Sequence, residues 1–241
     1  MRFSLIVIAI VFYTSCAPMY VPNTRNTPLF NGQGEVQGSA FIGTGIDLQA
    51  AAALTDNIGV IGNYSFLNET RNDPIDQSQT FKRKNSFFEG GIGYYQASRS
   101  RRIELYVGYG QGKGTTTGQY GFLGLGQQEV IVTGKYSRIF IQPSIGTNYR
   151  GFNVAFTPRF SLVNFREFQS GVTVEKPNEG AHLFLEPAAT ARFRLGQNLN
   201  GIFQLGLNMP TPNDAFFDHV PIQASFGVQL HLGGSLRTRI Y

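Results

Sequence analysis

The stretch PIQASFGVQLHL, residues 221–232, alternates between apolar and polar side chains without a break. A two-residue period predicts a β-strand with one apolar and one polar face. Strands in soluble sheets usually have about 5–6 residues, whereas a tilted strand that crosses a bilayer needs about 9–11. The stretch therefore favours a transmembrane β-strand. Its apolar face would carry Ile222, Ala224, Phe226, Val228, Leu230 and Leu232.

The same alternation recurs through the chain and predicts ten strands, with eight as the alternative. The expected strands are 35–42, 46–54, 58–66, 86–96, 102–110, 136–148, 152–164, 182–195, 201–209 and 221–232. The alanine-rich part of the second range has helical propensity, but its alternating neighbours and flanking turns favour a strand. The fold class expected is all-β: a closed antiparallel transmembrane β-barrel.

From the second strand onward, short and long connections alternate, and the longest is 111–135. Outer-membrane barrels have short periplasmic turns and longer external loops. An even number of strands places both ends of the barrel on the periplasmic side, so the connection at 43–45 would be a short external one.

Composition agrees with a barrel and excludes other classes. Charged residues make up 15% of the 241 residues, well below the roughly 25% of a typical globular protein. After residue 16, no window approaches the ~18 apolar residues of a spanning helix. The net charge of +5 is scattered over loops and alternate strand positions, so no nucleic-acid partner is expected.

The N-terminus has the layout of a secretory signal. Arg2 supplies a positive charge, and residues 3–12 form an apolar run too short to span a membrane. Cys16, the only cysteine of the chain, follows Ser15 and cannot form an internal disulfide. This segment resembles a bacterial lipobox, although Tyr13 departs from the usual Leu. The alternative is an ordinary signal peptide with a chance cysteine.

That resemblance divides the chain into three parts: a lipoprotein signal peptide at 1–15, a lipidated tether at 16–33, and the barrel at 34–241. Residues 17–33 are rich in Asn, Pro and Thr, which is typical of an extended tether. No acidic cluster follows Cys16 of the kind that surface-exported Bacteroidota lipoproteins carry. The resemblance therefore implies an anchor in the periplasmic leaflet of the outer membrane.

Nine charged residues are predicted to face the lumen. Five acids and four bases nearly balance, and ten strands enclose a space that side chains can fill. We interpret them as ion pairs that hold the interior shut, with a narrow solute path as the alternative. The residues are Glu35, Asp47, Glu89, Glu104, Arg138, Arg159, Glu186, Arg192 and Arg194.

Catalytic signals are weak, and no enzymatic activity, cofactor or metal site is expected. His231 and His182 lie on predicted strands, where hydrogen bonding is the commoner role. His219 follows Asp218, with Asp214 nearby, in an external loop and could form part of a hydrolase site at the rim, but no Gly-x-Ser-x-Gly elbow exists. The glycines around Lys113 do not have phosphate-loop spacing.

The span from about residue 34 to 241 resembles the outer-membrane β-barrel families of Bacteroidota, most clearly in the strand–turn–strand segment ALTDNIGV at 53–60. The resemblance is one of pattern and implies no activity. We expect a structural or accessory subunit of a larger outer-membrane complex, in contact with outer-membrane lipid. The alternatives are an adhesin or ligand-binding barrel acting through its loops and, third, the rim hydrolase.

Overall fold

The computed structural model of the chain describes residues 20–72, 80–122, 125–149, 151–170, 173–175, 180–211 and 219–233. The predicted signal peptide and Cys16 lie outside these residues. No helix within the described ranges is long and apolar enough to span a bilayer.

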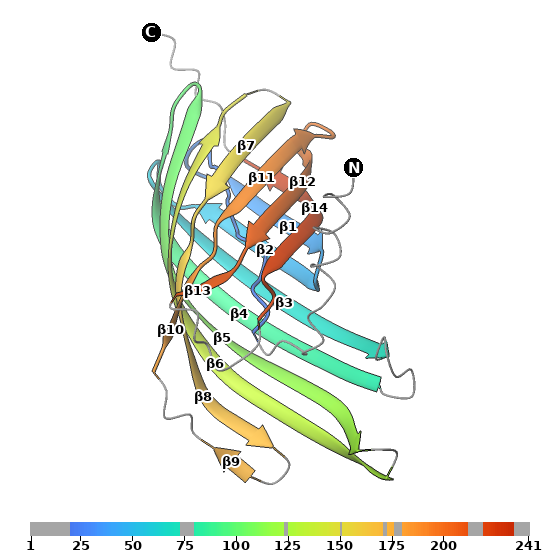
Figure 1. Cartoon of the computed structure of the whole chain (residues 1–241). Helices are drawn as coiled ribbons and strands as arrows, with labels where there is room; N and C mark the ends of the chain where they lie inside the picture. The colour runs from blue at the N-terminus through green and yellow to red at the C-terminus, as the bar shows by residue number, and fades with distance from the viewer. Residues whose placement is uncertain are drawn as a thin grey trace, which may run out of the picture.

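Fourteen strand segments build the molecule (Figure 1). They are β1 (Val36–Ile42), β2 (Ile46–Ala53), β3 (Ile58–Asn72), β4 (Thr80–Ala97), β5 (Arg101–Phe122), β6 (Leu125–Thr147), β7 (Phe152–Thr157), β8 (Phe160–Ser170), β9 (Thr173–Glu175), β10 (His182–Leu185), β11 (Ala188–Arg194), β12 (Leu199–Leu207), β13 (Met209–Thr211) and β14 (Ile222–Leu232).

These segments form a closed antiparallel barrel of ten strands, as predicted. Each strand pairs with its neighbour in the chain, and β1 pairs with β14 to close the wall. Three barrel strands are interrupted, so that β7 and β8, β10 and β11, and β12 and β13 each make one strand. The short β9 pairs only with β8 and lies off the barrel path.

The three interruptions lie side by side in the wall. They fall at Arg159, at Glu186 and at Asn208, and the first two adjoin Pro158 and Pro187. Proline has no backbone N–H and cannot continue a hydrogen-bonded ladder. Arg159 and Glu186 still exchange backbone hydrogen bonds at 3.3 and 2.7 Å, so the wall stays closed while their side chains point inward.

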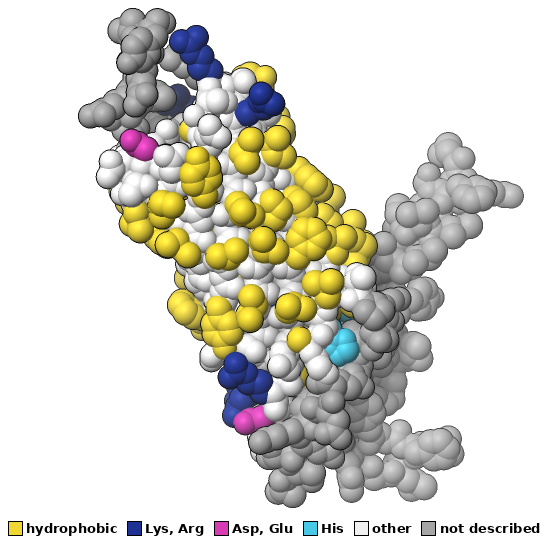
Figure 2. Space-filling model, turned by 90° about the vertical axis from the view of Figure 1, so that its left-hand side faces the viewer, with side chains coloured by type: hydrophobic (Ala, Val, Ile, Leu, Met, Phe, Trp, Pro, Cys, Tyr) yellow, Lys and Arg dark blue, Asp and Glu magenta, His cyan; other side chains and the backbone are white. Residues whose placement is uncertain are grey.

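An apolar band surrounds the outer surface. Figure 2 shows hydrophobic side chains in a broad belt with Lys and Arg gathered at its two ends. The predicted register is confirmed, because the residues assigned to the lipid face are exposed or half-buried while their neighbours in the strands face the lumen. Members of the band include Leu48, Phe88, Ile92, Leu105, Val107, Ile139, Phe156, Leu162, Phe226 and Val228.

The wall is much taller on one side. β5 and β6 have 22 and 23 residues, whereas β1 and β2 have 7 and 8. The expectation of a loop at 111–135 was wrong, since β5 continues to Phe122 and β6 begins at Leu125. The segment lacks apolar alternation because it rises beyond the apolar band. There the two strands stay paired through their backbone register and through side-chain contacts such as the Thr115–Thr133 hydrogen bond at 3.1 Å. Figure 1 shows the β5–β6 hairpin extending away from the short-turn end of the barrel.

Candidate functional site: a lumen filled by the N-terminal segment

Residues 20–30 pass through the inside of the barrel, and all of them are buried. At the long-hairpin end, the Tyr20 ring packs on Phe184 and Tyr136 at centroid distances of 5.0 and 5.5 Å. At the short-turn end, the Phe30 ring packs on Tyr95 at 5.2 Å. The segment expected to be an extended tether is extended, but from residue 20 onward it lies within the barrel. We call residues 20–30 the lumen segment.

The composition of the lumen segment explains how it can be held there. Pro22 and Pro28 restrict the backbone and lack N–H groups. The polar residues between them have short side chains except for Arg25. Barrel side chains bond several of its backbone groups, as buried polar groups require. Asp47 accepts from the Thr24 N–H at 2.9 Å, the Gln204 side chain bonds both backbone groups of Arg25 at 2.7 and 2.9 Å, and Gln142 donates to the Asn26 carbonyl at 2.7 Å.

Four predicted lumen charges form one buried ion network. Arg138 is paired with Glu89 and lies 3.9 Å from Glu186. Arg159 contacts Glu186 at 2.6 Å and Glu89 at 3.4 Å. All four side chains are completely buried. Two cations and two anions in alternating contact neutralise one another, which offsets the high cost of burying each charge.

The lumen segment completes this network. The Tyr20 hydroxyl donates to Glu186 at 2.6 Å and accepts from Arg138 at 2.8 Å. The Asn23 side chain donates to Glu89 at 2.7 Å, and its oxygen accepts from Arg138 at 2.6 Å and from Arg159 at 3.2 Å. Removing the segment would therefore take hydrogen-bond acceptors from both arginines.

Arg25 is a fully buried cation with no carboxylate within salt-bridge distance among the described residues. Neutral oxygens satisfy it instead. Its guanidinium donates to the Gln223 side chain at 2.8 Å, to the Leu207 carbonyl at 3.0 Å, and to the Asn208 side chain. Asn208 lies at the β12–β13 interruption, so the interrupted strand supplies one of the hydrogen-bond acceptors for Arg25.

The other predicted lumen charges bind the lumen segment and its continuation to Gln33. Glu104 accepts from the Phe30 N–H at 3.2 Å, and Glu35 accepts from the Asn31 N–H at 2.7 Å. Arg192 donates to the carbonyls of Thr27 and Pro28 at 2.7 and 3.0 Å. Together with Asp47, these residues form hydrogen bonds with the backbone of residues 24–31. The expected ion pairing therefore holds only for the four residues of the buried ion network.

Arg194 does not belong to the lumen. It is exposed at the short-turn end, where it donates to the Gly196 carbonyl at 2.8 Å. The expected place of Arg194 in the lumen was wrong, because alternation continues past the point where the barrel interior ends.

The histidines have structural surroundings. His219 forms an isolated parallel β-bridge with Tyr20, and its ring packs edge-on against the Phe184 ring at a centroid distance of 5.4 Å. His231 lies 3.4 Å from the Asn200 side chain. Asp214 and Asp218, the other members of the considered rim hydrolase site, lie outside the described residues. No group of three or more His, Cys, Asp or Glu residues in the described part could hold a metal ion.

Sequence reasoning did not identify Tyr20, Asn23 or Arg25 as interior residues. Alternation is the signal of a wall strand, and a segment surrounded by side chains on every side shows none. The available signal was the placing of two aromatic residues, Tyr20 and Phe30, at the ends of an otherwise polar stretch. Each joins one of the two buried aromatic clusters of the lumen.

Comparison with known proteins places the fold. No protein-family model and no curated protein matches the chain. Among solved structures, the outer-membrane protease OmpT from Escherichia coli aligns with a TM-score of 0.57 at 12% identity, covering 87% of this chain and 99% of that one. The translocator domain of the autotransporter NalP from Neisseria meningitidis aligns with a TM-score of 0.46 at 12% identity, covering 82% and 85%. By fold, the chain is an outer-membrane β-barrel.

Proposed function

We propose that this chain is a sealed, non-enzymatic barrel that serves as a structural or accessory subunit of an outer-membrane complex. The observation that carries the proposal is the filled lumen. A solute path would need water or mobile side chains along the axis, whereas here residues 20–30 and the central ion network are buried and hydrogen-bonded to the wall. A barrel without a passage acts through its outer surfaces.

The tall side of the wall is the surface we propose for partner contact. β4, β5 and β6 are the longest strands and extend as one paired sheet, while β1, β2 and β14 are short (Figure 1). Such a one-sided sheet offers a large face to a neighbouring protein. The second candidate is a barrel that binds a ligand through its external hairpins. It uses the same sheet and is favoured by a hollow whose lining includes Lys113, Lys135 and Arg166.

The rim hydrolase is the least supported function. His219 lies at the entrance of the lumen segment, bridged to Tyr20 and packed on Phe184, which supports a role in holding that segment. Likeness to a protease at 12% identity concerns the fold alone. A His219→Ala variant should therefore lose barrel stability rather than any hydrolytic activity.

We also propose that the chain is a lipoprotein of the Bacteroidota type, acylated at Cys16. The direction of the lumen segment argues against the expected periplasmic-leaflet anchor. Tyr20 is at the long-hairpin end, and the four residue steps back to Cys16 span at most about 14 Å. If short turns face the periplasm, an acyl group on Cys16 would reach the outer leaflet. We therefore propose an N-terminal anchor at the cell surface.

Mild-detergent extraction from native membranes, with an affinity tag in the 98–100 turn, tests the accessory role. We expect a stoichiometric protein partner to copurify. A variant that lacks residues 117–131, with the shortened strands rejoined by Asn-Gly, should keep the barrel and lose the partner. Isolation of the intact barrel alone, or retention of the partner by the trimmed variant, would refute docking through the tall wall.

The anchor has a separate test. Metabolic labelling with an alkyne fatty acid should mark the wild-type chain and not Cys16→Ser. On intact cells, an epitope inserted after Cys16 should be reached by antibody as readily as one between β5 and β6. An epitope in the 98–100 turn should be reached only after permeabilisation. Labelling of the Cys16→Ser chain, or protection of the first epitope in intact cells, would contradict the outer-leaflet anchor.

A further inference from the structure

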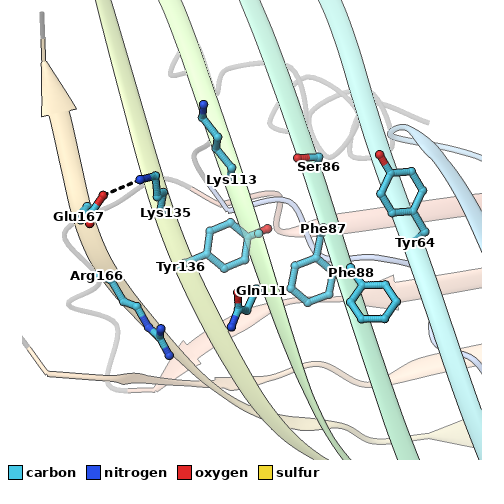
Figure 3. Close-up of a pocket in the computed structure, with 11 residues that line it drawn as sticks. Tyr64, Ser86, Phe87, Phe88, Gln111, Lys113, Lys135, Tyr136, Arg166 and Glu167 are labelled. Atoms are coloured by element: carbon cyan, nitrogen blue, oxygen red, sulfur yellow. Dashed lines mark hydrogen bonds and ion pairs between the residues drawn. The ribbon is translucent and has the colours of Figure 1, made fainter.

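A cationic hollow lies on the outer face of the tall wall, just beyond the apolar band (Figure 3). Its volume is about 460 Å³, and its lining includes Tyr64, Phe88, Gln111, Lys113, Lys135 and Arg166. Two aromatic lining residues, Tyr64 on β3 and Phe88 on β4, are exposed at the edge of the band, and the other two, Phe87 and Tyr136, are buried in the lumen cluster beneath. The cations lie on β5, β6 and β8. On β5, for example, Val107 and Tyr109 belong to the band, and Gln111 and Lys113 follow on the same face.

The cations are placed against one another in the sheet. The backbone register pairs Lys113 of β5 directly with Lys135 of β6, and both side chains point outward. Ser86 continues this row on one side and Glu167 on the other. Like charges directly opposite in an antiparallel sheet destabilise it. The pairing therefore favours a bound anion between them.

Within the part of the chain that the structure describes, Glu167 is the one carboxylate paired with these cations. Lys135 is 2.8 Å from Glu167, and both side chains remain well exposed, at 57% and 41%. Lys84 lies on β4 two residues beyond Ser86 and is also exposed. Neither Lys84 nor Lys113 makes an ion pair within the described ranges. With Arg166, the cluster has four cations and one anion. The excess of three positive charges is directed to the outside of the barrel.

The floor of the hollow is fixed by hydrogen bonds. The Tyr109 hydroxyl accepts from Arg166 at 3.0 Å and from the Gln111 side chain at 2.7 Å. These contacts hold the guanidinium at the level of the last aromatic residues of the band. A molecule in the hollow would thus meet apolar and aromatic surface on one side and ammonium and guanidinium groups on the other.

We propose that this hollow binds the phosphate-bearing headgroup of a membrane lipid. A lipid is the occupant we favour over a soluble anion because the hollow begins where the apolar band ends, so acyl chains could lie along Phe88 and Tyr64 while the phosphate meets Lys113, Lys135 and Arg166. Phosphate oxygens accept charge-assisted hydrogen bonds from such groups, and basic residues at this depth attract anionic headgroups. The proposal does not depend on the accessory role.

Native mass spectrometry of the full chain in dodecyl maltoside, titrated with phosphatidic acid, tests the site. We expect saturable binding of about one lipid, weakened about 10-fold or more in the Lys113→Gln/Lys135→Gln double variant, since each basic residue contributes separately to headgroup attraction. Diacylglycerol with the same acyl chains lacks the phosphate and should show no difference between wild type and variant. The matched control is Arg99→Gln/Arg101→Gln, which removes two exposed cations at the opposite end of the band.

A third variant separates a binding role from a structural one. Glu167→Gln removes the carboxylate that neutralises Lys135 and should tighten phosphatidic acid binding, whereas loss of a structural ion pair would leave binding unchanged or weaker. Equal weakening by the two double variants, no saturable binding, or full competition by millimolar inorganic phosphate would each overturn the lipid site. Unchanged heat-modifiable migration on gels shows that each variant is folded.

Discussion

At the scale of single residues, the lumen is stabilised by groups that are costly to bury alone. Glu89 shows this most clearly, since Arg138, Arg159, Asn23 and Asn63 all bind its carboxylate. Replacing Glu89 by Gln keeps the shape but leaves two buried arginines with one carboxylate. We expect a loss of about 3–5 kcal/mol in the free energy of unfolding, measured by urea titration in detergent micelles.

The control for this loss is a pair at the rim. Glu69 and Arg83 are in contact at 2.7 Å but remain partly exposed, at 24% and 12%. Glu69→Gln should cost no more than about 1 kcal/mol, as is usual for ion pairs in contact with solvent. Similar losses in both variants would mean that the lumen network is not a special source of stability.

A glycine in β5 shows how closely the lumen is packed. A Cβ at Gly112 would lie 2.4 Å from the Tyr136 ring and 2.8 Å from the Phe87 ring, and these two rings are stacked on each other. Gly112→Ala should therefore destabilise the barrel by about 1–3 kcal/mol through overpacking. Gly62 on β3, where a Cβ would meet nothing within 4 Å, is the matched site, and alanine there should be tolerated in the same urea titration.

At the scale of elements, the position of the lumen segment can be tested by cross-linking. The Thr27 and Thr157 hydroxyls are 3.2 Å apart, and those of Thr24 and Ser225 are 2.9 Å apart. Cysteine pairs at these positions, in a Cys16→Ser chain, should form disulfides with little movement. A shift in gel mobility that dithiothreitol reverses would report each bond.

The mismatched pair Thr24→Cys/Thr157→Cys fixes the register of the segment. Three residues of extended chain separate Thr24 from Thr27, which is about 10 Å and too far for a disulfide. If the mismatched pair cross-links as well as the matched ones, the segment does not have the path described for it.

The same elements show what the sequence can and cannot predict. Wall strands follow from alternation, because one face meets lipid and the other the lumen, and the register of β14 and β2 was correct on that basis. Glu89, Arg138, Arg159 and Glu186 were correctly placed inside, but their partners depend on which strands adjoin. The lumen segment and the heights of β5 and β6 could not be derived, since neither depends on an apolar face.

At the scale of the whole molecule, the filled lumen predicts a barrel that does not conduct. In planar bilayers, the folded wild-type chain should give no discrete current steps. Replacing Tyr20, Asn23 and Arg25 together by Gly should give such steps, because it removes the side chains that bridge the lumen segment to the ion network and to Asn208. Regular steps from wild-type protein that runs as a folded, heat-modifiable band would contradict the sealed interior.

The pairing of β1 with β14 bears on the order in which the protein can assemble. The wall closes only when its last strand, in chain order, joins its first. Residues 20–30 are by then linked to β1 and enclosed by side chains from nearly every strand. Passing Arg25 through a finished, tightly packed interior would require many buried contacts to break at once. The segment must therefore be laid against the growing sheet before the seam closes, so that the barrel folds around its own N-terminus as a template.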